Sequence, residues 1–165
     1  MNRELQRIIH DSDSRYLTSD EKDKFSHYFE RFATHVKHAE AIEEAEDAAV
    51  RFCIENTRKR YPNFDKYHDK AWAKAFRDVQ LTLRYNVQAM LLDDRQGLDD
   101  KLLYWLRTIL AGFNFTPEFN RDTYTYLLEG IKKNVPPATA EAITPYLERT
   151  IEIMSDFPEP AVAAV

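Results

Sequence analysis

Apolar residues recur along this chain at the spacing of one face of an α-helix. One stripe begins at Phe25 and another at Trp72, and both continue at helical intervals of three and four residues. Further stripes begin at Leu102 and at Tyr124. No segment keeps the two-residue alternation that is typical of a half-buried strand. The pattern therefore predicts an all-α protein.

Capping residues and prolines divide this pattern into helices. Thr18 and Glu21 have the spacing of a capping box, Thr116 precedes a proline, and Gly97 is expected to end a helix. The expected helices cover residues 2–12, 19–36, 39–60, 65–92, 99–112, 117–134 and 138–155. Unequal helices with short breaks favour a globin-like fold with an N-terminal helical extension. We expect one such domain at 1–157 and a flexible tail at 158–165.

Composition narrows the classes of function. The chain of 165 residues is long enough for one domain with a core, and its net charge of −5 gives no general attraction to nucleic acid or to anionic membranes. No apolar run approaches the ~20 residues that span a bilayer, and no signal-peptide pattern follows Met1. The single cysteine, Cys53, excludes an intramolecular disulfide. We therefore expect a cytoplasmic protein without a nucleic-acid or membrane partner.

The motifs of common catalytic and metal sites are absent from the sequence. There is no glycine-rich phosphate loop, no Cys-x-x-Cys and no Gly-x-Ser-x-Gly. His35 and His38 share a helix face, but no Glu-x-x-His pair accompanies them. We expect neither an enzyme nor a metal site.

Candidate chemistry is concentrated in the segment 74–78, which reads Lys-Ala-Phe-Arg-Asp and is followed by Leu-Arg-Tyr at 83–85. Lys74 and Asp78 are four residues apart, and this spacing alone favours a surface ion pair worth ~0.3–0.5 kcal/mol. The whole segment, however, resembles the chromophore-binding helix of the phycobiliproteins. Further blocks at 13–18, 113–119 and 126–132 resemble the same family in the same order.

The resemblance implies a pocket for a linear tetrapyrrole, or bilin. Asp78 would accept hydrogen bonds from the inner pyrrole N–H groups and favour the protonated bilin, while Lys74 and Arg77 would hold the propionates. The aromatic residues that the resemblance places at the pocket are Phe113, Phe119, Tyr85 and Trp72. Each of these four aromatic residues also fits a core position, and that alternative stays open.

One departure from the family changes the expected function. Ala75 occupies the position that matches the cysteine to which the bilin is attached, so that covalent bond cannot form there. Cys53 is the alternative anchor. The pattern is most like the bilin-biosynthesis-associated globins that lack the usual attachment cysteine. The implied ligand is biliverdin or a reduced, phycocyanobilin-like bilin, bound non-covalently for carriage, storage or sensing.

The resemblance also implies partners and leaves alternatives. The N-terminal helices, within residues 1–36, would form a homodimer or heterodimer, and enzymes of bilin biosynthesis are the other expected partners. One alternative is a structural, phycobilisome-like subunit without a chromophore. Another is a haem-binding globin, although no histidine lies at 99–112, where an axial ligand is expected. In this alternative, His68 would be the distal contact.

Overall fold

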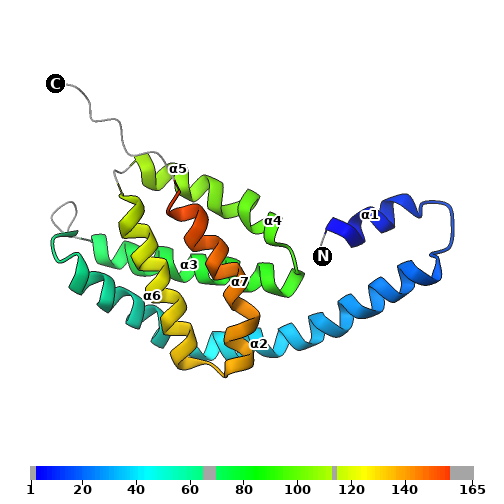
Figure 1. Ribbon diagram of the computed structural model, residues 1–165, viewed down its shortest axis with the longest axis horizontal. Helices are drawn as coiled ribbons and strands as arrows, with labels where there is room; N and C mark the ends of the chain where they lie inside the picture. Colours follow the sequence, from blue (N-terminus) through cyan, green and yellow to red (C-terminus); the bar gives the residue numbers. More distant parts are fainter. Residues whose placement is uncertain (1–2, 65–69, 113–114, 157–165) are drawn as a thin grey trace.

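The computed structural model describes residues 3–64, 70–112 and 115–156, and every element within them is a helix. The elements are α1 (Arg3–Asp11), α2 (Ser19–Arg60), α3 (Ala71–Leu92), α4 (Arg95–Leu98), the π-helical turn η2 (Asp99–Leu103), α5 (Tyr104–Gly112), α6 (Pro117–Asn134) and α7 (Pro137–Met154). The all-α prediction is confirmed. Figure 1 shows α3 to α7 gathered into a body, from which the first half of α2 extends as an arm that carries α1.

The long helix α2 corrects the expected division into helices at 19–36 and 39–60. It runs unbroken for 42 residues. Neither glycine nor proline occurs between Ala33 and Ile42, so nothing in that stretch ends a helix. The expected break coincides with a change of neighbours, because the apolar face of the first half packs on α1 and that of the second half packs in the body.

The corner between α1 and α2 is fixed by a capping box with an added ion pair. The Thr18 hydroxyl accepts a hydrogen bond from the Glu21 N–H at 3.3 Å, and the Glu21 carboxylate accepts one from the Thr18 N–H at 2.8 Å. Arg15 donates to both oxygens of this carboxylate, at 2.7 and 2.8 Å. These hydrogen bonds lower the pKa of Glu21 from 4.5 to about 2, and the hydrogen bond from Arg15 is the largest cause.

The body has a core that is separate from the small apolar cluster of the arm. Its members come from the second half of α2 and from α3 to α7, and include Val50, Leu83, Leu103, Leu127 and Leu147. The arm cluster consists of Leu5, Ile8 and Tyr28, with partly buried neighbours. Within the body, α6 approaches α2 closely at Gly130, where a Cβ atom would lie 2.6 Å from the carbonyl oxygen of Ala49.

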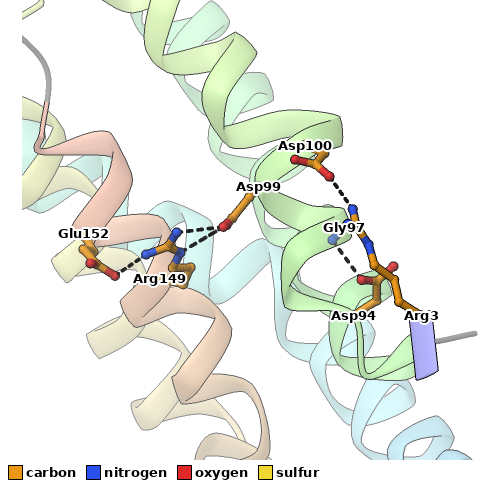
Figure 2. A network of polar contacts seen from close by, with 7 residues as sticks. All are labelled: Arg3, Asp94, Gly97, Asp99, Asp100, Arg149 and Glu152. Atoms are coloured by element: carbon orange, nitrogen blue, oxygen red, sulfur yellow. Dashed lines mark hydrogen bonds and ion pairs between the residues drawn. The ribbon is translucent and has the colours of Figure 1, made fainter.

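A π-helical turn, which the sequence pattern did not indicate, connects several elements (Figure 2). Asp99 in η2 is buried and accepts a hydrogen bond from Arg149 of α7 at 2.7 Å, while Arg149 also pairs with Glu152. The next residue, Asp100, pairs with Arg3 of α1. The turn therefore contacts α7 within the body and also ties the body to α1 of the arm.

Other helix bounds differ from the expected ones at their ends. Gly97 lies inside α4, and the chain turns earlier, at Asp93, which has a left-handed φ of 49° after α3. Helix α3 begins later than expected, at Ala71, whereas α6 has the expected bounds. The expected tail at 158–165 lies outside the described residues. In the described part of the chain, no helix is both long and apolar enough for a membrane span.

Candidate ligand-binding site

The predicted motif lies on helix α3, and one face of this helix is directed toward α6. Ala71, Ala75, Asp78 and Thr82 are spaced so that they share this face. Ala71 and Thr82 are buried, and the Thr82 hydroxyl lies 3.4 Å from the hydroxyl of Tyr124 on α6. Ala75 and Asp78 are partly buried. Ala75, which the family resemblance aligns with the attachment cysteine, therefore lies at the edge of the interior and carries a methyl group.

The charged residues of the motif lie at the solvent side of this face. The Arg77 guanidinium donates to Oδ1 of Asp78 through Nε at 3.1 Å and through Nη2 at 2.9 Å. The two side chains are 66% and 41% exposed. Lys74 is exposed one turn earlier on the same helix. The structure thus brings Arg77 and Asp78 together, in an exposed pair that contributes about 0–1 kcal/mol to stability.

The carboxylate of Asp78 also affects the interior. Tyr124 is buried on α6, and its pKa is raised, mainly by burial and to a smaller extent by the nearby negative charge of Asp78. Asp78 is therefore close enough to the space between α3 and α6 to act electrostatically on groups there.

A cluster of five aromatic rings joins the end of α2 to the starts of α3 and α6. The ring centroid of Phe64 lies 4.7 Å from that of Trp72, 5.0 Å from that of Phe119 and 5.6 Å from that of Phe115. Tyr61 contacts Phe119 edge-on at 5.0 Å. We call these five residues the aromatic cluster. It unites Trp72 and Phe119, which the sequence analysis assigned to one pocket.

Two polar features border the aromatic cluster. The indole Nε1–H of Trp72 is buried and has no hydrogen-bond partner within the described part of the chain, and the Arg58 guanidinium lies 5.8 Å from the indole ring. The Tyr61 hydroxyl donates a hydrogen bond to the Asp122 carboxylate at 2.7 Å. Burial, and to a smaller extent this hydrogen bond, raise the pKa of Tyr61 to about 12. An unpaired buried donor is unfavourable, so Trp72 is suited to meet an acceptor on a ligand.

The sequence pattern did not indicate three members of this cluster, Tyr61, Phe64 and Phe115. All three flank helix ends, where the sequence shows only the breaks after α2 and before α6. Their aromatic character was the available signal. It was ambiguous, because nothing in the spacing along the chain indicates that two distant helix ends meet.

The other predicted site residues do not join the aromatic cluster. Tyr85 is exposed on α3, thirteen residues after Trp72 and thus about 20 Å along the helix axis. It lies beside Asp94 and Lys101 at a small hollow. Phe113 lies outside the described residues.

Cys53 is poorly placed for covalent attachment. It is fully buried on α2, and its thiol donates to the Thr123 carbonyl oxygen at 3.2 Å. Burial raises the pKa of the thiol to about 12, so the nucleophilic thiolate is disfavoured.

The described residues offer little to a haem iron or a metal ion. The described histidines, His10, His27, His35 and His38, all lie on α1 and α2, and His68 is outside the described residues. Within the described part of the chain, no three metal-ligating side chains gather at one place. The groups on α3 and in the aromatic cluster instead fit a linear tetrapyrrole, because they combine a carboxylate, two cations, stacking rings and a free N–H donor.

Comparisons with known proteins identify a family and partial relatives. A family model described as "Phycobilisome protein" matches residues 9–154. The beta subunits of class 2 C-phycoerythrin from Parasynechococcus marenigrum (strain WH8102) and Synechococcus sp. (strain WH8103) are each 37% identical over 65 residues, or 39% of this chain. The match covers 36% of each subunit, so the chain spans little more than a third of the length of these relatives.

Proposed function

Because this chain belongs to the phycobilisome protein family, we propose that it binds a linear tetrapyrrole without a covalent bond. The family match confirms the resemblance read from the motif on α3 and the expected globin-like, all-α fold. The observation that carries the proposal is the combination at 75–78: an alanine at the attachment position, partly buried, beside the Arg77–Asp78 pair. The charged groups that would bind the ligand are present, but the cysteine thiol that would attach it is replaced by the methyl group of an alanine.

Each group has a role that follows from its chemistry. Asp78 accepts hydrogen bonds from pyrrole N–H groups and, as a carboxylate, favours the cationic bilin. Lys74 and Arg77 pair with the propionates, for which Arg77 exchanges its present contact with Asp78. Trp72 and Phe119 stack on the ring system. When bound, the bilin supplies absorption of visible light, and the protein supplies charge, shape and exclusion of water.

We further propose that the ligand is biliverdin or a reduced, phycocyanobilin-like product, and that the role is carriage, storage or sensing in the cytoplasm. A ligand that is bound without a covalent bond can dissociate, and its transfer to another protein requires this dissociation. Enzymes of bilin biosynthesis are then the natural sources and recipients of the ligand. The expectation of a protein that is not an enzyme agrees with membership of the family.

A structural subunit without a chromophore is the second candidate function. The observation that favours it is the close contact among the five rings of the aromatic cluster, which pack on one another. In that account, the Arg77–Asp78 pair is an ordinary surface ion pair. The family match gives no support to the haem alternative.

The arm supports the proposal of a dimer, either with a second copy or with a related subunit. A shallow hollow of about 540 Å³ lies on the first half of α2, and its lining residues are Leu17, Lys22, Phe25, Ser26, Phe29, Glu30 and Ala33. Phe29 in this hollow is 59% exposed. A phenylalanine this exposed on an apolar surface favours burial against a partner.

The role of Asp78 is tested by the Asp78→Ala variant. We expect weaker binding of biliverdin and a blue-shifted, broader absorption band, because the protonated bilin loses its counter-charge. The matched control is Asp47→Ala, which removes another exposed carboxylate paired with an arginine, Arg51, on α2. An absorption band in Asp78→Ala that equals those of the wild type and the control would exclude the assigned role.

A further inference from the structure

Phe64 holds a central position in the aromatic cluster. It follows α2 by four residues, and its N–H donates to the Tyr61 carbonyl oxygen at 3.2 Å, which turns the chain back toward the cluster. Its ring contacts Trp72 on one helix and Phe119 on another, and it is inclined by only 22° to the ring of Phe119. Phe64 thus links the two aromatic residues that the proposed function assigns to the ligand.

We propose that Phe64 is an internal competitor of the ligand, occupying the place that one pyrrole ring takes between Trp72 and Phe119. This inference rests on the proposed function. A phenyl ring and a pyrrole ring are both flat and of comparable width, and both stack on aromatic neighbours. Binding then requires the Phe64 ring to leave, and release of the ligand lets it return.

The unpaired N–H of Trp72 is consistent with an exchange of this kind. A phenyl ring offers no hydrogen-bond acceptor, so contact with Phe64 leaves the buried Nε1–H without a partner in the described part of the chain. A bilin carries lactam oxygens on its terminal rings and propionate oxygens on its inner rings, and either kind of oxygen accepts such a hydrogen bond. Trp72 therefore gains a partner when a bilin replaces Phe64, and this gain offsets part of the lost ring contacts.

The competition lowers the apparent affinity for the ligand. When the binding-competent state is populated only in part, the apparent dissociation constant rises by the inverse of that fraction. Removal of the Phe64 ring makes the competent state the default. We expect Phe64→Ala to bind biliverdin roughly tenfold more tightly than the wild type.

Trp72 serves as the local reporter for the experiment. The chain has two tryptophans, and Trp105 is 62% exposed on α5, so Trp105→Phe leaves Trp72 as the single tryptophan, which is excited selectively over tyrosine. In this background we would titrate three proteins with biliverdin, namely the one that keeps Phe64 and the variants Phe64→Ala and Phe64→Leu. Quenching of the Trp72 fluorescence would report binding. Phe64→Leu keeps an apolar side chain in place if the alanine variant folds poorly. Phe52→Ala is the matched control, because Phe52 is also partly buried but lies outside the aromatic cluster, against Lys133.

A second probe separates the failure of this inference from that of the proposed function. The same variants are titrated with 8-anilinonaphthalene-1-sulfonate, a flat aromatic anion, and energy transfer from Trp72 reports binding beside it. Tighter biliverdin binding in the Phe64 variants, but not in Phe52→Ala, supports the inference. Biliverdin binding that is unchanged or weakened in both Phe64 variants overturns it and leaves the proposed function standing.

Two remaining outcomes concern the bilin itself. If biliverdin binds to none of the proteins while the aromatic anion binds more tightly to the Phe64 variants, the proposed function fails and the competition by Phe64 holds for flat ligands in general. If neither probe binds near Trp72 in any variant, both proposals are overturned.

Discussion

Gly130 lies where α6 approaches α2, and a Cβ atom at this position would come within 2.6 Å of the Ala49 carbonyl oxygen. Alanine is the better helix former by about 1 kcal/mol. The contact is with backbone, however, so the two helices must move apart to admit a methyl group. We expect Gly130→Ala to lower the free energy of unfolding by about 1–3 kcal/mol, as overpacking does, measured by urea denaturation.

Gly112 provides the control for this prediction. It is also helical, at the end of α5, and among the described residues no atom other than those of its chain neighbours and its own helix backbone lies within 4 Å of the position that its Cβ would take. Gly112→Ala is expected to leave stability unchanged or to raise it by up to about 1 kcal/mol. Equal effects of the two substitutions would show that helix propensity, and not the α2–α6 approach, decides the outcome.

Single residues also show how far the sequence predicts the site. The motif identified Arg77 and Asp78, which the structure pairs, because their spacing along one helix is a local property. Phe64 and Phe115 could not be assigned in this way, since they meet only when the ends of distant helices pack together. Local spacing predicts residues on one element, and tertiary packing decides which of them form a site.

At the scale of elements, the cap and proline before α6 predicted a helix boundary well, whereas Gly97, which was expected to end a helix, lies inside α4. Helix α6 has its expected bounds, with Thr116 accepting a hydrogen bond from the Phe119 N–H and Pro117 in its first turn. The expected division of α2 was wrong because it rested on the apolar pattern alone, without a glycine or proline. The π-helical turn has no comparable signal in the sequence, and its Asp99 pairs with Arg149, which lies 50 residues further along the chain.

The start of α2 carries a prediction about pH. Glu21 has a pKa of about 2 in the folded protein, against an ordinary value of 4.5, because Arg15 and the Thr18 N–H bind its carboxylate. Its contribution to stability is therefore complete above pH 4.5 and is lost as the pH falls from 4.5 toward 2. We expect amide hydrogen exchange in the first turn of α2 to accelerate relative to α6 over this range.

The Glu21→Gln variant isolates this effect. Glutamine can keep the hydrogen bond to the Thr18 N–H but cannot titrate. Exchange in the first turn of α2, taken relative to α6, should therefore be faster than in the wild type near neutral pH and should change little as the pH falls. If Glu21→Gln shows the same acceleration on acidification as the wild type, another group is responsible.

At the scale of the whole molecule, the arm and the body have separate apolar clusters. The arm cluster is small, and the hollow beside it leaves Phe29 exposed. We expect the protein to self-associate, or to associate with a related subunit, through this surface. Phe29→Asp should reduce self-association in sedimentation experiments over a range of protein concentrations.

Tyr16 supplies the comparison for the arm, because it is 96% exposed and does not line the hollow. Tyr16→Asp adds the same charge to the arm without altering the hollow. Self-association that is lost in Phe29→Asp and kept in Tyr16→Asp supports the proposed interface. Equal loss in both would indicate an effect of charge alone.

The central claim is that the whole molecule is a non-covalent bilin-binding protein. It is tested most directly by a titration of the purified protein with biliverdin, followed by red absorbance and then by denaturation in acidic urea. We predict a sharpened, red-shifted band at saturation and complete release of free bilin on denaturation, because Ala75 offers no thiol and Cys53 is buried. Bilin retained on the denatured chain, or no spectral change on titration, would contradict the account.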